Sequence, residues 1–414
     1  MKKIIVGTLC VMLLWSFAEA QAQDNKLVIW SHWKGDPIKM NFMQAVAAEF
    51  EKAAGIKVEI VWLTKNELKD KFALAFGSPE PDLTYVDYEF THPRLSGPLL
   101  DLSALKFSGQ LDTMWSLGSV GEGKNNFLPF EGASSAMYYN KALFAKAGIV
   151  TPQDRPVTDQ EFLDIIKKLR AAGITPVGEG VADRQWKGTY PIVNAIFRFA
   201  GPEKLVQLTK GAINFADPDV VKALTFWKQV VEAHAYDNEK ALKLSLSEGI
   251  WEMTDGKAAL SFCGTWIYSK FGATERDKGQ VGVLDWFTAA NGKGNDFYDM
   301  AWVAGYGINR NSQRLEAAQK FLAFLMTPAA ANLYVKHVQG PYPVAAAELA
   351  AETLYSSLTA LRSQKKPVNI ALAPLDFGSK AANNMWLQET QKFITGAQTV
   401  EGFIEQMNSR LQAK

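Results

Sequence analysis

The sequence predicts an α/β protein of two lobes, each with helices packed against a sheet. Strands and helices alternate at the start of the chain, an order that is typical of a parallel sheet. The chain has 414 residues, which is long for one hydrophobic core and favours about two domains. Its 48% hydrophobic and 21% charged residues describe an ordinary globular protein.

Residues 1–22 are expected to be a cleaved signal peptide. A pair of lysines precedes an apolar stretch at 4–17, and Ala18, Ala20 and Ala22 provide small-residue cleavage sites. The apolar stretch is shorter than the roughly 20 residues that a membrane helix needs. We therefore expect an exported, periplasmic protein that does not insert into the membrane.

The core alone must stabilise the mature chain. Cys10 belongs to the signal peptide, and the bulky Leu9 before it does not fit a lipoprotein signal. Cys263 is then the only cysteine that remains, so no internal disulfide can form.

The formal net charge of +1 gives no general attraction to nucleic acid or to anionic membranes.

Local sequence patterns locate the strands and helices of the first lobe. Pro37 and Gly55 bound the first helix, and Thr64 with Glu67 forms a capping box for the second. Ligands of such sheets bind beyond the carboxyl ends of the parallel strands. The strands are expected at 26–30, 58–62 and 81–87; Ser31, His32, Trp33 and Lys34 follow the first, and Asp87, Tyr88 and Glu89 follow the third.

A near-match to a nucleotide-binding loop occupies residues 118–125. It has the GxxxxGK spacing, but Asn125 stands where Ser or Thr would hold magnesium, and no clear strand precedes it. We expect a plain loop here and no nucleotide cofactor.

The segment from Pro129 to Lys141 is expected to lead from the first lobe into the second. It starts extended, continues as an aromatic strand and ends where a helix begins. Later strands are expected at 174–177, 256–262, 281–287 and 301–309, with helices after Thr158, Trp186 and Asp217 and beyond residue 313.

Four segments occur in a characteristic order along nearly the whole mature chain. They are Leu27-Val28-Ile29-Trp30, Pro81-Asp82-Leu83, Met137-Tyr138-Tyr139-Asn140-Lys141, and Gly256-Lys257-Ala258-Ala259 leading to Gly264-Thr265-Trp266. In this order, behind an export signal, they resemble the extracellular solute-binding proteins of family 1. These are the sugar-binding components of ABC importers, built like maltose-binding protein.

The resemblance implies a two-lobed periplasmic-binding-protein fold of type II, with the solute in the cleft between the lobes. The N-terminal lobe would comprise 24–130 and 301–331, and the C-terminal lobe 132–285 and 332–414. The chain would cross near 129–132 and 285–300. The implied function is capture of a mono- or oligosaccharide and its delivery to a membrane ABC permease, by a monomer without metal or cofactor.

A sugar site should pair aromatic rings with polar side chains. Sugars present C–H faces that sit on rings, and hydroxyl edges that hydrogen-bond to acids and amides. Trp30 and Trp227 lie in apolar patterns and are expected in the core, while Asp82, Tyr139 and Asn140 are expected to be scaffold. The expected ligand-binding residues are Trp33, Asp87, Glu89, Glu131, Trp186, Trp266, Trp302, Asn383 and Asn384.

Catalysis has little support in the sequence. The four histidines are far apart, and no HExxH, GxSxG or Cys/His cluster is present. An exported glycoside hydrolase with a carboxylate pair such as Glu131 and Asp87 is the alternative enzyme. A sensor component that presents bound solute to a membrane receptor is the other alternative, and the sequence does not separate it from a transport component.

Overall fold

The computed structural model describes most of the chain after residue 25. Described are residues 26–75, 77–87, 97–105, 125–182, 190–267, 271, 280–299, 302–338, 342, 354–368, 377 and 379–411. The near-match to a nucleotide-binding loop therefore lies almost wholly outside the described residues. Among the helices of the described part, none combines the length and the apolar character needed to cross a membrane.

The chain divides into two compact units. Unit 1 extends to Gly132 and resumes over Val303–Glu348, whereas unit 2 comprises Ala133–Trp302 and Leu349–Lys414. The boundary expected at residue 331 falls inside helix α14 (Pro328–Val338), and the whole helix belongs to unit 1. The reason is packing, because α14 lies against the first helix of that unit.

Unit 1 is built on a five-stranded sheet. Its strand order is β2 (Lys57–Trp62), β1 (Lys26–Ser31), β3 (Leu83–Val86), β10 (Trp302–Ile308) and β4 (Leu128–Ala133). Strand β1 pairs in parallel with β2 and β3, as the alternating pattern predicts, and β10 is antiparallel to β3. The carboxyl ends of β1, β2 and β3 therefore meet at one edge of the sheet.

Helices of unit 1 show the predicted end signals. The Asp36 side chain caps α2 (Pro37–Ala54), and Gly55 ends it in the left-handed conformation at φ 69°. Thr64 and Glu67 form the predicted capping box of α3 (Lys65–Leu74). Aromatic contacts join α2 to α14 and to α13 (Leu315–Leu325): Phe42 lies 5.0 Å from Tyr334, and Phe50 lies 5.1 Å from Phe321, between ring centroids.

Unit 2 contains a four-stranded sheet and a two-stranded one. The larger sheet has the order β6 (Thr175–Val177), β7 (Ala258–Gly264), β5 (Ser135–Asn140) and β8 (Val281–Leu284). Strand β5 is antiparallel to both β7 and β8, whereas β6 is parallel to β7. Strands β9 (Phe297–Asp299) and β11 (Lys366–Val368) pair in parallel.

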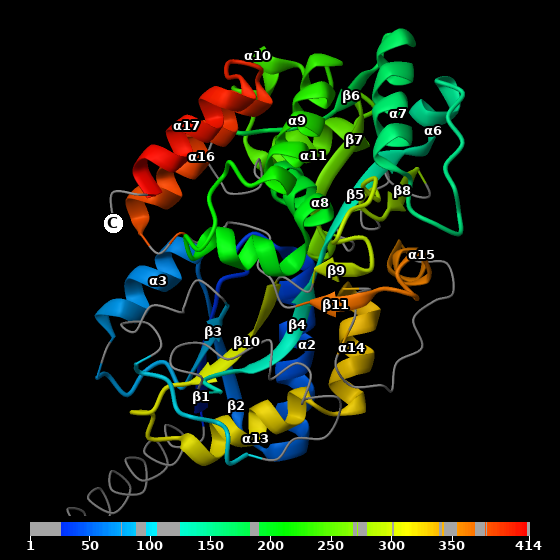
Figure 1. Ribbon diagram of the computed structural model, residues 1–414. Helices are drawn as coiled ribbons and strands as arrows, with labels where there is room; N and C mark the ends of the chain where they lie inside the picture. Colours follow the sequence, from blue (N-terminus) through cyan, green and yellow to red (C-terminus); the bar gives the residue numbers. More distant parts are fainter. Residues whose placement is uncertain are drawn as a thin grey trace, which may run out of the picture. The chain divides into compact units, whose positions relative to one another are not determined.

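Helices surround the larger sheet of unit 2 (Figure 1). Thr158 and Glu161 form the predicted capping box of α7 (Asp159–Ala171), and α8 (Tyr190–Thr209) is kinked at Gly201, φ 84°. The other helices within the described residues of unit 2 are α6 (Lys141–Lys146), α9 (Pro218–Glu232), α10 (Asn238–Ala241), α11 (Leu246–Thr254), the 3-10 turn η3 (Thr265–Ile267), α15 (Leu354–Leu361), α16 (Lys380–Ile394) and α17 (Val400–Leu411).

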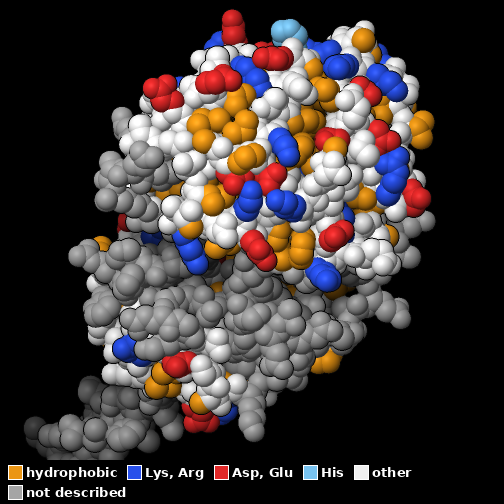
Figure 2. Space-filling view, in the orientation of Figure 1, with side chains coloured by type: hydrophobic (Ala, Val, Ile, Leu, Met, Phe, Trp, Pro, Cys, Tyr) orange, Lys and Arg blue, Asp and Glu red, His pale blue; other side chains and the backbone are white. Residues whose placement is uncertain are grey.

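The tryptophans expected in the core differ in burial. Trp227 is fully buried and stacks on Phe162 at 5.9 Å between ring centroids, as predicted. Trp30 is only half-buried, because it packs against a charged side chain of α3: the Lys71 ammonium lies 5.5 Å from its ring centroid. In the part of the surface that Figure 2 colours by residue type, acidic and basic side chains are interspersed, with groups of hydrophobic side chains between them.

Asp82 and Asn140, two of the three residues expected to be scaffold, form buried hydrogen bonds to the backbone. Asp82 accepts the Val28 N–H at 2.7 Å and the Ser312 hydroxyl at 2.6 Å, which ties β1 to the segment before α13. Asn140 accepts the Leu143 N–H at 3.1 Å at the start of α6 and donates to the Met253 carbonyl at 3.1 Å. Both side chains are buried and hold neighbouring backbone segments together.

Candidate functional site

The candidate site lies in unit 1, at the edge where the parallel strands end. We call it the carboxyl-edge cluster. His32 and Trp33 follow β1, Lys65 follows β2, Asp87 follows β3, and Glu131 lies near the end of β4. Tyr85 of β3 and Lys39 of α2 complete the cluster.

Aromatic rings enclose Trp33. Its side chain is only 3% exposed, and its ring meets Tyr85, Phe130 and Tyr306 edge-on at centroid distances of 5.6, 6.2 and 6.2 Å. The Lys39 ammonium lies 5.3 Å from the centroid of the Trp33 ring, a cation–π distance. Since protein atoms occupy its surroundings, Trp33 is better suited to donate from its indole N–H than to serve as an open stacking surface.

Charges in the cluster are paired. The Lys39 ammonium forms an ion pair with Glu131, and both side chains are buried. The Lys65 ammonium lies 2.7 Å from Asp87 Oδ2, and Asp87 is fully buried. Removing one partner of such a pair leaves an uncompensated buried charge, which costs about 3–5 kcal/mol.

Burial shifts the pKa values of the cluster. It raises the pKa of Glu131 from its usual value, against the opposing effect of Lys39. It also lowers the pKa of His32 well below the usual value, and the nearby Lys65 and Lys39 ammonium groups lower it further. His32 is therefore a neutral imidazole at pH 7.

Several buried polar atoms of the cluster lack a hydrogen-bond partner among the described residues. They are His32 Nδ1, Trp33 Nε1, Tyr85 Oη and Glu131 Oε2. The side chains that carry these atoms adjoin one another. The Tyr85 ring centroid lies 3.9 Å from that of His32 and 5.6 Å from that of Trp33. Glu131 is paired with Lys39, whose ammonium lies 5.3 Å from the Trp33 ring centroid. Native proteins rarely leave buried polar groups unsatisfied, because each costs about 1–3 kcal/mol. A bound polar molecule or ordered water would satisfy them.

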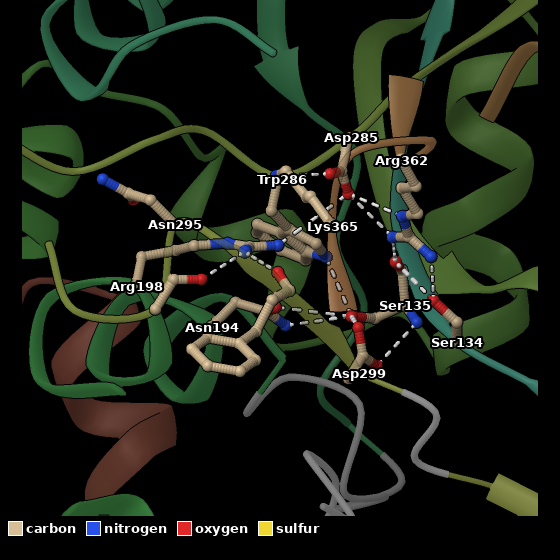
Figure 3. Close-up of polar contacts among 12 residues, drawn as sticks. Ser134, Ser135, Asn194, Arg198, Asp285, Trp286, Asn295, Asp299, Arg362 and Lys365 are labelled. Carbon is tan, nitrogen blue, oxygen red and sulfur yellow. Dashed lines mark hydrogen bonds and ion pairs between the residues drawn. The ribbon is translucent and has the colours of Figure 1, made fainter. Parts of the chain in front are cut away.

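Unit 2 contains a different polar cluster, a buried network of ion pairs and hydrogen bonds (Figure 3). Asp285, just after β8, accepts from Arg362 Nε at 2.9 Å and from the Lys365 ammonium at 2.7 Å. Arg198 of α8 lies 3.8 Å from the same carboxylate and donates to the Gly294 carbonyl at 2.9 Å. Burial alone would raise the pKa of Asp285, but Arg362, Lys365 and Arg198 hold it below its usual range.

Ser135 joins this network at the start of β5. Its N–H and hydroxyl donate to the Asp299 carboxylate at 2.8 and 3.0 Å, and its hydroxyl oxygen accepts the Trp286 N–H at 2.9 Å. Burial raises the pKa of Asp299 to about 6. Since residues 133 and 302 bound the first segment of unit 2, the network anchors the backbone close to both points where the chain changes unit.

Trp266 is positioned at the same end of the unit 2 sheet. It follows β7 in the turn η3 and is half-buried. Gly264 is required beside it, because a Cβ there would come within 2.4 Å of the indole nitrogen. The preceding Thr265 hydroxyl accepts the Ser134 N–H at 3.1 Å. Trp266 is thus held by the start of β5 and the end of β7.

The expected ligand-binding residues fall into groups. The structure brings Trp33, Asp87 and Glu131 together in unit 1, and Trp266 lies in unit 2. Asn383 accepts the Phe377 N–H at 2.8 Å near the start of α16, and Asn384 is exposed. Glu89 and Trp186 lie outside the described residues, as does the side chain of Trp302, whose backbone begins β10.

Sequence reasoning missed Lys39, Lys65 and Tyr85. A signal for Lys39 was available, because it lies on the same helical face as Phe42 and Met43, where a buried lysine needs an anionic partner. Lys65 and Tyr85 had no comparable signal. A lysine at the start of a helix and a tyrosine within an apolar strand are ordinary in those positions.

Sequence comparison gives a family. The family model for bacterial extracellular solute-binding proteins matches residues 34–332. Among curated proteins, the chain is 27% identical over 144 residues to a protein of Brucella abortus (strain 2308) named only as a binding protein. The match takes 35% of this chain and 34% of the relative, so the chain spans about a third of the length of the curated relatives it matches.

Structural comparison gives matches over nearly the whole length. A chitin oligosaccharide binding protein superposes with a TM-score of 0.77 at 22% identity, covering 94% of this chain and 98% of the other. A structure from work on xylan utilization by Caldanaerobius polysaccharolyticus gives 0.78 at 20% identity, covering 93% and 99%. The maltose-bound MalE3 protein of T. maritima gives 0.69 at 19% identity, covering 94% and 99%. These matches confirm the predicted two-lobed α/β fold.

Proposed function

The chain belongs to the family of bacterial extracellular solute-binding proteins, and we propose that it captures a carbohydrate outside the cytoplasmic membrane and delivers it to an ABC permease. The periplasm is the proposed location, and a monomer without metal or cofactor is the proposed form. The carbohydrate is proposed because the family match comes with a site of suitable chemistry and with solved relatives whose names refer to chitin oligosaccharide, xylan and maltose.

One observation carries the proposal: buried polar atoms without a hydrogen-bond partner among the described residues belong to adjoining side chains where the parallel strands of unit 1 end. This edge is where sheets of this class bind ligands. A sugar combines apolar C–H faces with hydroxyl groups that both donate and accept hydrogen bonds. Trp33 and Tyr85 offer hydrogen-bond donors, and Tyr85 and Glu131 offer acceptors, for the hydroxyl groups of a sugar.

Binding would proceed in two steps. Solute would first bind mainly to one unit, and the other unit would then close over it by bending of the connecting segments. Closure is favoured only by contacts that the solute gains in the closed form. Trp266 in unit 2 is proposed to supply one such contact, since it is half-buried and held at the end of β7.

The test is a binding assay with the mature protein and a panel of neutral malto-, cello-, xylo- and chito-oligosaccharides. A saturable rise in melting temperature with one series, confirmed by calorimetry, is expected. Mass spectrometry of solute that copurifies with the exported protein provides an independent identification. If no sugar stabilises the protein and none copurifies, the proposal is wrong.

The same assay also tests the alternative that the protein is an enzyme. A glycoside hydrolase would use Asp87 and Glu131, but each of these carboxylates is paired with a lysine ammonium. Such pairing suits a static binding site better than a carboxylate pair that exchanges protons with substrate. Sugars should therefore be recovered unchanged after prolonged incubation, and the appearance of shortened products would favour the enzyme.

A further experiment distinguishes delivery of the sugar to a permease from its presentation to a sensor. Both partners would recognise the sugar-bound protein, so the binding site itself does not distinguish them. Crosslinking of sugar-loaded protein in native membranes, followed by mass spectrometry, should recover ABC permease subunits. Recovery of a receptor without permease subunits would favour the sensor.

A further inference from the structure

We infer that unit 1 recognises an electrically neutral, hydroxyl-bearing part of the solute, so that neutral sugars bind in preference to their acidic or amino counterparts. This inference rests on the proposed function and specifies the chemistry of the same site. It concerns the carboxyl-edge cluster, whose charges and hydrogen-bonding atoms impose different demands on neutral and ionised ligands.

The buried charges already have partners of opposite sign. Glu131 is paired with Lys39, and Asp87 with Lys65. An anionic ligand would have to compete with Glu131 or Asp87 for its lysine, and a cationic ligand would have to compete with the lysines. In either case one charge would be left desolvated without compensation. A neutral group leaves both pairs intact.

Neighbouring ionisable groups do not create an excess of either sign. Lys69 is a third cation near His32, and Asp36 is a third acid, whose charge raises the pKa of Glu131. Burial and Lys65 lower the pKa of Lys69, while Asp87 and Asp70 raise it. His32 itself is neutral, because its pKa lies well below the usual value. The described residues around the cluster therefore provide no uncompensated charge that would attract an ionised sugar.

The unsatisfied atoms require both donors and acceptors from the ligand. Trp33 Nε1–H can only donate, an ionised Glu131 Oε2 can only accept, and Tyr85 Oη can do both. A hydroxyl group matches this set, because it donates and accepts. A carboxylate only accepts and would be repelled by Glu131, whereas an ammonium only donates and would oppose the Trp33 N–H.

The experiment compares matched ligands by calorimetry on the mature protein. Neutral oligosaccharides from the panel above are paired with counterparts that carry a terminal uronic acid, and chito-oligosaccharides with their de-N-acetylated forms. We expect the neutral member of each bound pair to have at least about tenfold higher affinity. If the acidic or amino member binds as tightly or more tightly, the inference is wrong while the sugar-binding proposal stands.

Two variants test whether the preference for neutral sugars arises from the carboxyl-edge cluster. Tyr85→Phe removes one hydroxyl and keeps the ring, and should weaken neutral-sugar binding about fivefold to tenfold. Glu131→Gln leaves Lys39 without its anionic partner, and should shift the ratio of neutral to acidic affinity towards the acid by about tenfold. Glu59→Gln is the matched control, because it removes an exposed carboxylate paired with Lys26 in the same sheet.

The outcomes separate the two proposals. An unchanged ratio in Glu131→Gln together with unchanged affinity in Tyr85→Phe would overturn the inference, even if sugars bind. If Glu131→Gln fails to fold, the sugar affinity of Tyr85→Phe alone tests the inference. Absence of binding by every sugar, neutral or charged, would overturn the proposed function and this inference with it.

Discussion

Asp299 should make the folded protein less stable as the pH rises through the neutral range. Burial raises the pKa of this carboxyl to about 6 in the folded protein, compared with about 3.9 in an unfolded chain. The folded state therefore holds a proton more tightly than the unfolded state. The stability that this proton contributes is complete below about pH 4 and is lost as the pH rises through about 6.

The magnitude follows from the shift. About two pKa units correspond to about 3 kcal/mol in the free energy of unfolding. Replacing Asp299 by Asn removes the ionisation and retains one oxygen that can accept from Ser135, at a cost of about 1 kcal/mol for the altered hydrogen bond. The variant should be slightly less stable than the native protein near pH 4 and more stable by about 2 kcal/mol near pH 8.

Urea unfolding followed by circular dichroism, at a series of pH values between 4 and 8, measures this difference. Asp296→Asn is the matched control, because it removes an exposed carboxylate from the same segment. A difference between Asp299→Asn and the native protein that stays constant from pH 4 to 8 would refute the reasoning.

Further predictions concern both units. Trp266→Ala should weaken solute binding by at least ~1–3 kcal/mol, the burial value of a large aromatic side chain, with unchanged circular dichroism; unchanged affinity in calorimetry would remove Trp266 from the site. Glu131→Ala should lower the free energy of unfolding by about 3–5 kcal/mol, because Lys39 is left buried and unpaired; a loss below ~1 kcal/mol in urea unfolding would contradict the buried pair. Asp82→Ala should cost about 2–4 kcal/mol, because the Val28 N–H and the Ser312 hydroxyl lose their acceptor; a melting temperature equal to that of the native protein would disprove this role.

Local signals predicted most of the elements. The capping boxes at Thr64 and Thr158 begin helices in the structure, and Gly55 ends a helix, as the sequence predicts. Strands β1, β2, β8 and β10 lie within a few residues of the expected ranges. These predictions succeed because a helix cap or a strand pattern depends on residues within a few positions of one another.

Part of the candidate site could also be predicted. Trp33 and Asp87 were expected at the ends of β1 and β3, and the parallel pairing of these strands brings them to one edge. Lys65 and Tyr85 could not be selected, because nothing in their local sequence distinguishes them from ordinary helix-start and core residues. Their roles arise from Asp87 and His32, which they meet only in the folded unit.

The sequence by itself determined the class of the protein, the order of its elements and the chemistry available at the strand ends. Only the tertiary structure decided which charges are paired: Lys39 with Glu131, and Arg362 with Asp285, are separated by 92 and 77 residues. The physical reason is that burial and partner choice depend on how distant segments pack. The lysines and carboxylates of unit 1 thereby become a neutral, partly unsatisfied cluster, which no local pattern specifies.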